Sequence, residues 1–240
     1  MIAPQQSAPR CSLQPGVVAL PHGLLWLERS RALVAADAHF GYEELIGGVL
    51  PLWSTREIVR ILSDAIDANG AHELIFLGDV IHGSRMSDGA ARAVNAALAT
   101  LRGVVRVTIV AGNHEGPSRG ATLLGDTEDA VERDGWVLAH GDEPIAAARC
   151  IIGHLHPSLA LGSRETAPAF LASSRLIVVP ALTPYSSGLN VLSAACTKAL
   201  RQFSVTMTAL QVVVAGTDRV YPFGSLAALR AALSSGRARR

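Results

Sequence analysis

The sequence is poor in cysteine and has no long apolar run. Its three cysteines, Cys11, Cys150 and Cys196, have neither the pairing of a disulfide framework nor the spacing of a thiolate metal site. No apolar run reaches the length of a membrane span. Residues 1–15 are polar and lack the basic start and apolar stretch of a signal peptide. We therefore expect a cytoplasmic protein that makes no contact with a membrane.

Net charge and aromatic residues are also scarce. The formal net charge of +1 indicates neither a nucleic-acid partner nor an acidic one, although a local basic patch would be enough to bind DNA. Aromatic residues make up 5% of the chain, whereas 49% of it is hydrophobic. This composition favours a compact protein whose core is built from Ala, Val, Leu and Ile.

Short apolar runs and amphipathic stretches predict an α/β fold. Strands are expected at 17–20, 24–28, 32–36, 74–77, 105–110, 136–139, 150–152, 176–179, 189–192, 205–210 and 212–215, and helices at 54–68, 90–101 and 225–233. Strands alternate with helices at first and then dominate, which indicates two packed sheets with helices outside. We expect a disordered segment over 1–15, a single domain over 16–235 and a basic tail over 236–240.

Polar side chains follow five of the predicted strands. They are Asp37 and His39, then Asp79, Asn113, His140, and finally His154 and His156. In open α/β sheets, ligands bind beyond the carboxyl ends of strands. These side chains could therefore converge on one site.

Carboxylate, imidazole and amide groups are suitable ligands for a two-metal centre. Two ions about 3.5–4 Å apart can hold a phosphate and activate a water between them. Asp37 and His39 are two residues apart, as are His154 and His156, so each pair can point to one side of an extended segment. Each motif alone is weak, since a lone Gly-Asp is usually a turn and a lone Asn-His is usually a loop or a helix cap.

The ordered set of motifs resembles the calcineurin-like metallophosphoesterase superfamily. The motifs are Asp37-Ala38-His39, Gly78-Asp79, Gly112-Asn113-His114-Glu115, His140-Gly141 and Gly153-His154-Leu155-His156. The resemblance implies an α/β/β/α four-layer sandwich of two mixed β-sheets flanked by helices. It also implies a phosphoesterase that works by in-line attack of a metal-bridging hydroxide on phosphorus.

The same resemblance implies a role for each motif residue. Asp37, His39 and His156 would hold the first metal, Asp79 would bridge, and Asn113, His140 and His154 would hold the second. His114 would lie near the scissile phosphate as an acid or transition-state stabiliser, and Glu115, which replaces the commoner Asp, would orient it. Outside the resemblance, His82 follows Asp79 by three residues and could reach the substrate.

A narrower set of motifs resembles the ligase-associated DNA-damage-response endonucleases. These motifs span residues 76–82, 140–144, 153–157, 178–181 and 185–190. The resemblance implies a phosphodiesterase that acts on DNA in repair, in functional association with a DNA ligase and a helicase.

Two other functions remain open from the residues. One is hydrolysis of small phosphodiesters or nucleotides, and the other is a non-catalytic scaffold on the same fold, which is disfavoured because every ligand position carries a competent side chain. The oxygen and imidazole ligands favour two divalent ions of Mn²⁺, Fe or Zn²⁺. Of these we expect Mn²⁺.

Overall fold

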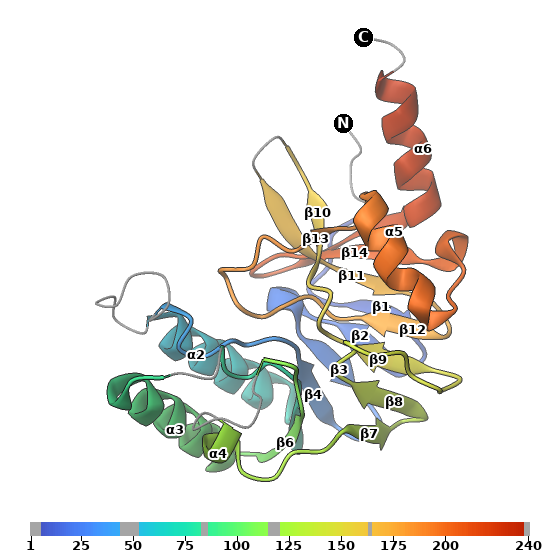
Figure 1. Cartoon of the computed structure of the whole chain (residues 1–240). Helices are drawn as coiled ribbons and strands as arrows, with labels where there is room; N and C mark the ends of the chain where they lie inside the picture. The colour runs from blue at the N-terminus through green and yellow to red at the C-terminus, as the bar shows by residue number, and fades with distance from the viewer. Residues whose placement is uncertain (1–5, 44–52, 83–85, 115–120, 163–164, 238–240) are drawn as a thin grey trace.

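The computed structural model describes residues 6–43, 53–82, 86–114, 121–162 and 165–237. Two mixed β-sheets lie face to face with helices on their outer sides (Figure 1). The first sheet has the order β1-β2-β3-β4-β5-β6, from the strands β1 (Cys11–Gln14), β2 (Val17–Ala19), β3 (Leu25–Leu27), β4 (Ala32–Ala35), β5 (Glu73–Leu77) and β6 (Arg106–Val110). The expected fold class is therefore confirmed.

The second sheet is formed by the later part of the chain. Its order is β13-β10-β11-β12-β9-β8-β7, with β14 paired to β11 and β15 paired to β14. The strands are β7 (Ala130–Arg133), β8 (Trp136–Ala139), β9 (Cys150–Ile152), β10 (Pro157–Ala160), β11 (Thr166–Ala172), β12 (Leu176–Val178), β13 (Leu189–Asn190), β14 (Gln211–Ala215) and β15 (Val220–Ser225).

Helices cover both outer faces. On the first sheet lie α2 (Trp53–Asn69), α3 (Asp88–Arg102) and α4 (Ala121–Leu124), and on the second lie α5 (Ala194–Leu200) and α6 (Leu226–Arg237). Three 3₁₀ turns are η1 (Pro21–Gly23), η2 (Arg201–Phe203) and η3 (Met207–Ala209). No helix in the described part of the chain is long and apolar enough to cross a membrane.

The alternation of side chains along the strands separates the core into three layers. In β4, Leu33 and Ala35 pack against the helices α2 and α3, whereas Val34 packs between the two sheets. In β9, Ile151 faces the first sheet, whereas Cys150 and Ile152 face α5 and α6. Successive residues of a strand point to opposite faces, so strands that are apolar throughout are buried on both sides.

The strand directions bring several strand ends to one edge. Strands β4, β5 and β6 run parallel in the first sheet, and β8 and β9 run parallel in the second. A bridge between Ala36 and Ala181 and a hydrogen bond from the Leu182 amide to the Ala36 carbonyl join the sheets near this edge. The carboxyl ends of these five strands are followed by the predicted polar side chains.

Three sequence-based expectations need correction. The segment 1–15 is not disordered throughout, because Cys11–Gln14 pairs with β2 and the side chains of Cys11 and Leu13 pack against the core between the sheets. The expected strand over 205–210 is wrong: Ser204 adopts a left-handed φ of 50°, and the chain then forms η3. Helix α6 continues to Arg237, so the expected basic tail from 236 begins inside the helix.

The end of β5 opposite the edge with the predicted polar side chains carries a buried ion pair between the sheets. Glu73, which is 1% exposed, accepts hydrogen bonds from Arg133 of β7 at 2.8 Å and from the Thr108 hydroxyl at 2.6 Å. Arg106 lies 2.9 Å away. Burial raises the pKa of Glu73, but Arg133 and Thr108 outweigh it, so the pKa lies below its usual value.

We predict that Glu73→Gln lowers the free energy of unfolding by about 1–3 kcal/mol near neutral pH, since it removes a buried charged hydrogen-bond acceptor. Because the folded pKa is depressed, the stabilisation is full above the unfolded value of about 4.3 and is lost as pH falls through the folded pKa. Urea unfolding at several pH values measures the difference, with the exposed Glu132→Gln as control. A constant difference down to pH 2 would contradict this account.

Candidate metal centre

Five strand-end loops bring the seven predicted ligands into one cluster. Two groups of side chains each have ligand atoms within 4.8 Å of one another: Asp37, His39 and His156 form the first group, and Asp79, His140 and His154 form the second. Asn113 joins the second group, because its Oδ1 atom lies 3.0 Å from Nε2 of His140. Their roles as ligands remain a prediction at this point.

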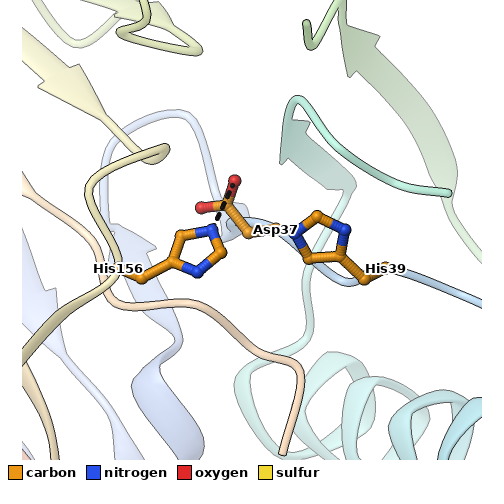
Figure 2. A group of neighbouring side chains, drawn as sticks. All are labelled: Asp37, His39 and His156. Carbon is orange, nitrogen blue, oxygen red and sulfur yellow. Dashed lines mark ion pairs between the residues drawn. The ribbon is translucent and has the colours of Figure 1, made fainter. Parts of the chain in front are cut away.

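Asp37 is the centre of the first group. Figure 2 shows its contact with His156, whose Nε2 atom lies 3.3 Å from Oδ1, and the ring of His39 on the other side of the carboxylate. The Oδ2 atom accepts a hydrogen bond from the His154 amide at 2.9 Å, but the buried Oδ1 atom has no hydrogen-bond partner. A buried carboxylate oxygen without a hydrogen bond is costly unless a cation lies beside it, either a protonated His156 or a metal ion. The residues of the first group therefore fit a metal ion.

His140, which follows β8, contacts the other residues of the second group. Its Nδ1 atom lies 2.9 Å from the Leu77 carbonyl, which can only accept, so Nδ1 carries the proton. In the neutral ring the lone pair of Nε2 then faces Oδ1 of Asn113, Nδ1 of His154 at 3.1 Å and Oδ2 of Asp79 at 3.5 Å. Electron-pair donors that face one another repel unless a proton or a metal ion lies between them. The second group therefore also fits a metal ion.

Burial favours the neutral form of the histidines, which is the form that can bind a metal ion. Burial lowers the pKa of His39 to about 3, and the neighbouring histidine rings add to the shift. Burial, followed by the His140 ring, lowers the pKa of His154. For His156 burial acts in the same direction, but Asp37 and Asp79 outweigh it and raise the pKa. His39 and His154 are therefore neutral at pH 7, with a lone pair available for a metal.

The backbone at the site is held in an unusual conformation. Asp37, His39, Asp79, His154 and His156 all have φ between 43° and 57°, in the left-handed region that residues other than glycine seldom adopt. Such conformations persist only where the surrounding structure enforces them, and they cluster at functional sites. Their concentration at one edge of the sandwich supports a functional role for that edge.

His114 and His82 lie beside these two groups. The His114 amide donates to Oδ1 of Asp79 at 3.0 Å, and the His114 ring is stacked on the His82 ring with centroids 5.1 Å apart. Nδ1 of His82 lies 2.8 Å from Nδ1 of His39. Both rings line a cavity of about 140 Å³ together with His39 and His156. Glu115, the expected partner of His114, lies outside the described residues.

Sequence reasoning did not identify two kinds of site residue. Ser186 lies 2.7 Å from Nδ1 of His156 through its Oγ atom, so it holds the ring with Nε2 toward Asp37. Tyr42 and Tyr185 line the 140 Å³ cavity. Ser186 and Tyr185 belong to the motif over 185–190, but no spacing in the sequence connects them to His156 or to Tyr42.

Comparisons with known proteins agree with this geometry. The family model for calcineurin-like phosphoesterases matches residues 30–159. The crystal structure of Pseudomonas putida nuclease MPE has a TM-score of 0.64 and 20% sequence identity, over 90% of this chain and 98% of that chain. The E. coli phosphoesterase Yfce has a TM-score of 0.40 and 18% identity, over 66% of this chain and 83% of that chain. No curated protein matches the sequence. At these identities the likeness to the nuclease concerns the fold.

We predict that Ser186→Ala weakens Mn²⁺ binding by about 10–100-fold, because partners that orient a metal-binding histidine contribute on this scale. Calorimetric titration of the metal-free protein with Mn²⁺ measures the effect. Ser187→Ala, at a neighbouring hydroxyl that makes no such contact, should bind as the wild type does. Equal binding by both variants would show that Ser186 does not position His156.

Proposed function

The chain belongs to the calcineurin-like phosphoesterase family and is a metal-dependent hydrolase; we propose that it is a phosphodiesterase that cleaves DNA. The observation that carries a two-metal mechanism is the convergence of two ligand groups, one with a buried oxygen of Asp37 that makes no hydrogen bond and the other with Asn113, His154 and Asp79 gathered within 3.5 Å of Nε2 of His140. The choice of DNA is supported by the motifs shared with the ligase-associated endonucleases and by the likeness in fold to a nuclease.

We further propose how the residues divide the work. Asp37, His39 and His156 hold one ion, Asn113, His140 and His154 hold the other, and the Asp79 carboxylate is shared. When bound, two divalent ions would polarise the phosphoryl oxygens and lower the pKa of a water between them. We propose Mn²⁺, with Fe or Zn²⁺ as alternatives, because the ligands are oxygen and imidazole.

His114 and His82 act on the leaving group. The His114 side chain is 46% exposed and lines the cavity over the ligand groups, where it can donate a proton to the departing oxygen. His82, stacked on it, fixes the plane of its ring and can contact the substrate. The narrower resemblance and the sparse cysteines support a cytoplasmic repair role beside a DNA ligase and a helicase.

One observation favours a second candidate function, the hydrolysis of small phosphodiesters or nucleotides. The cavity over the ligand groups is only about 140 Å³, and none of its described lining residues is a lysine or arginine. Binding of a polynucleotide backbone ordinarily uses several such cations. A short substrate would need none beyond the metal ions.

A substrate panel distinguishes the two candidate functions. The purified chain is assayed with Mn²⁺, Fe²⁺ and Zn²⁺ in turn, against single-stranded DNA, duplex DNA, RNA and small phosphodiesters. Metal-dependent cleavage of DNA is the result we expect. Turnover of small phosphodiesters without cleavage of DNA would contradict the first proposal and establish the second.

We predict that Asp79→Asn retains fewer than two equivalents of metal, because it removes the anionic oxygen shared by both ions. The loss of affinity should exceed the roughly 10–100-fold cost of changing an orienting partner. Elemental analysis after dialysis measures the metal content, with Asp126→Asn, an exposed carboxylate outside the two ligand groups, as control. Two full equivalents on Asp79→Asn would refute the shared carboxylate.

We predict that His114→Ala keeps both metals but loses about 10²–10⁴-fold in kcat on substrates with poor leaving groups, because it removes a proton donor. The defect should shrink for p-nitrophenolate, which leaves without a proton. The exposed His72→Ala serves as control. Loss of one metal, with equal impairment for every leaving group, would make His114 a ligand instead.

A further inference from the structure

Two tyrosines from distant loops meet in the lining of the 140 Å³ cavity beside the predicted metal ligands. Tyr42 lies three residues after His39, and Tyr185 directly precedes Ser186. Their rings are stacked, with centroids 5.3 Å apart and an angle of 25° between the planes. Tyr42 also packs edge-on against His82, with centroids 4.5 Å apart. The pair is therefore held in a fixed position next to the ligand groups.

The two rings differ in their exposure to solvent. Tyr185 is 41% exposed and is one of the few large hydrophobic residues exposed in the described part of the chain. Tyr42 is half-buried between Tyr185 and His82. Because the rings are already in contact, nothing fits between them, so a flat group can stack only on the outer face of Tyr185.

Tyr185 lies at the boundary between two cavities. One is the 140 Å³ cavity over His39, His82 and His114, and the other is a cavity of about 430 Å³. Both cavities are lined by His156, Thr183, Tyr185 and Ser186, so they adjoin. A phosphate in the smaller cavity would leave its substituent in the larger one, whose volume lies in the range of about 300–1,000 Å³ common for small-molecule sites.

The lining of the larger cavity is neutral and suits a heterocycle and a sugar. Among its described lining residues, His156 alone can carry a charge near neutral pH. Hydroxyl groups and proline rings predominate in the lining. The prolines are Pro157, Pro168 and Pro184, and the hydroxyls belong to Ser158, Thr166, Thr183, Ser186 and Ser187. Uncharged hydrogen-bonding groups around one aromatic face are typical of sites for planar, polar ligands.

The other side of the metal centre has the opposite character. A cavity of about 550 Å³ beside Gly112 and His140 is lined by the carboxylate residues Asp129, Asp142 and Glu143. These carboxylates would repel further phosphates of a nucleic-acid backbone. The substituent of the bound phosphate is therefore directed toward Tyr185.

We propose that Tyr185, supported by Tyr42, binds the nucleobase of the nucleotide whose phosphate lies at the metal centre. The ligand is a nucleotide unit, with its base stacked on the outer face of Tyr185 and its sugar in the 430 Å³ cavity. This proposal rests on the proposed phosphoesterase site, but it holds for DNA and for small nucleotides alike. Stacking on an aromatic side chain tolerates any base, so the site selects for a base without reading its sequence.

The test is a calorimetric comparison of two ligands on the Mn²⁺-loaded full chain. The ligands are 2′-deoxyadenosine 5′-monophosphate and 2-deoxyribose 5-phosphate, in which a hydroxyl group replaces the base. The wild type should bind the nucleotide about 5–100-fold more tightly, the range that base stacking on an aromatic residue supplies. Tyr185→Ala should remove this preference, whereas Tyr185→Phe should keep it. Leu161→Ala, an exposed apolar residue outside these cavities, should behave as the wild type does.

Two results would overturn the proposal. Tyr185→Ala could retain the preference for the nucleotide, or it could weaken both ligands equally, in which case the ring shapes the phosphate site alone. The outcome is independent of DNA cleavage. A protein that cleaves no DNA but shows the preference refutes the DNA substrate and supports the stacking. A protein that cleaves DNA but binds both ligands equally refutes the stacking alone.

Discussion

The positions of the predicted metal ligands depend on the contact between His140, which follows β8 of the second sheet, and the Leu77 carbonyl at the end of β5 in the first. This hydrogen bond joins the two sheets at the edge where the ligands meet, and it fixes which ring nitrogen faces the second group. Gly78 makes the approach possible: its φ is 74°, and a Cβ atom there would overlap the His140 ring. A side chain at position 78 would therefore displace the predicted ligand His140 as well as strain a turn.

Several features at the same edge destabilise the folded chain. The buried Asp37 oxygen that makes no hydrogen bond and the left-handed backbone at five site residues both raise the free energy of the folded chain. The interactions that offset this cost lie elsewhere, in the three apolar layers and in the Glu73 ion pair at the opposite end of β5. A bound cation beside Asp37 would remove part of this cost, so metal binding would stabilise the folded chain.

The sequence was informative where side-chain chemistry follows a buried strand. Asp37, Asp79 and His140 each follow an apolar run, and parallel strands bring their carboxyl ends together, so their meeting was predictable. Strand β1 was missed because it is short, has only two apolar residues and lies at a sheet edge, and α5 was missed although Ser193 caps it. The contact between Tyr42 and Tyr185 could not be predicted, because two loop residues with no periodicity meet only through the packing of both sheets.

The central claim is that the two groups together hold two ions with a shared carboxylate. Anomalous diffraction from crystals grown with Mn²⁺ tests it most directly. The account predicts two peaks about 3.5–4 Å apart, one beside Asp37, His39 and His156 and the other beside Asn113, His140 and His154, with Asp79 between them. A single peak, or two peaks too far apart for Asp79 to contact both, would contradict it.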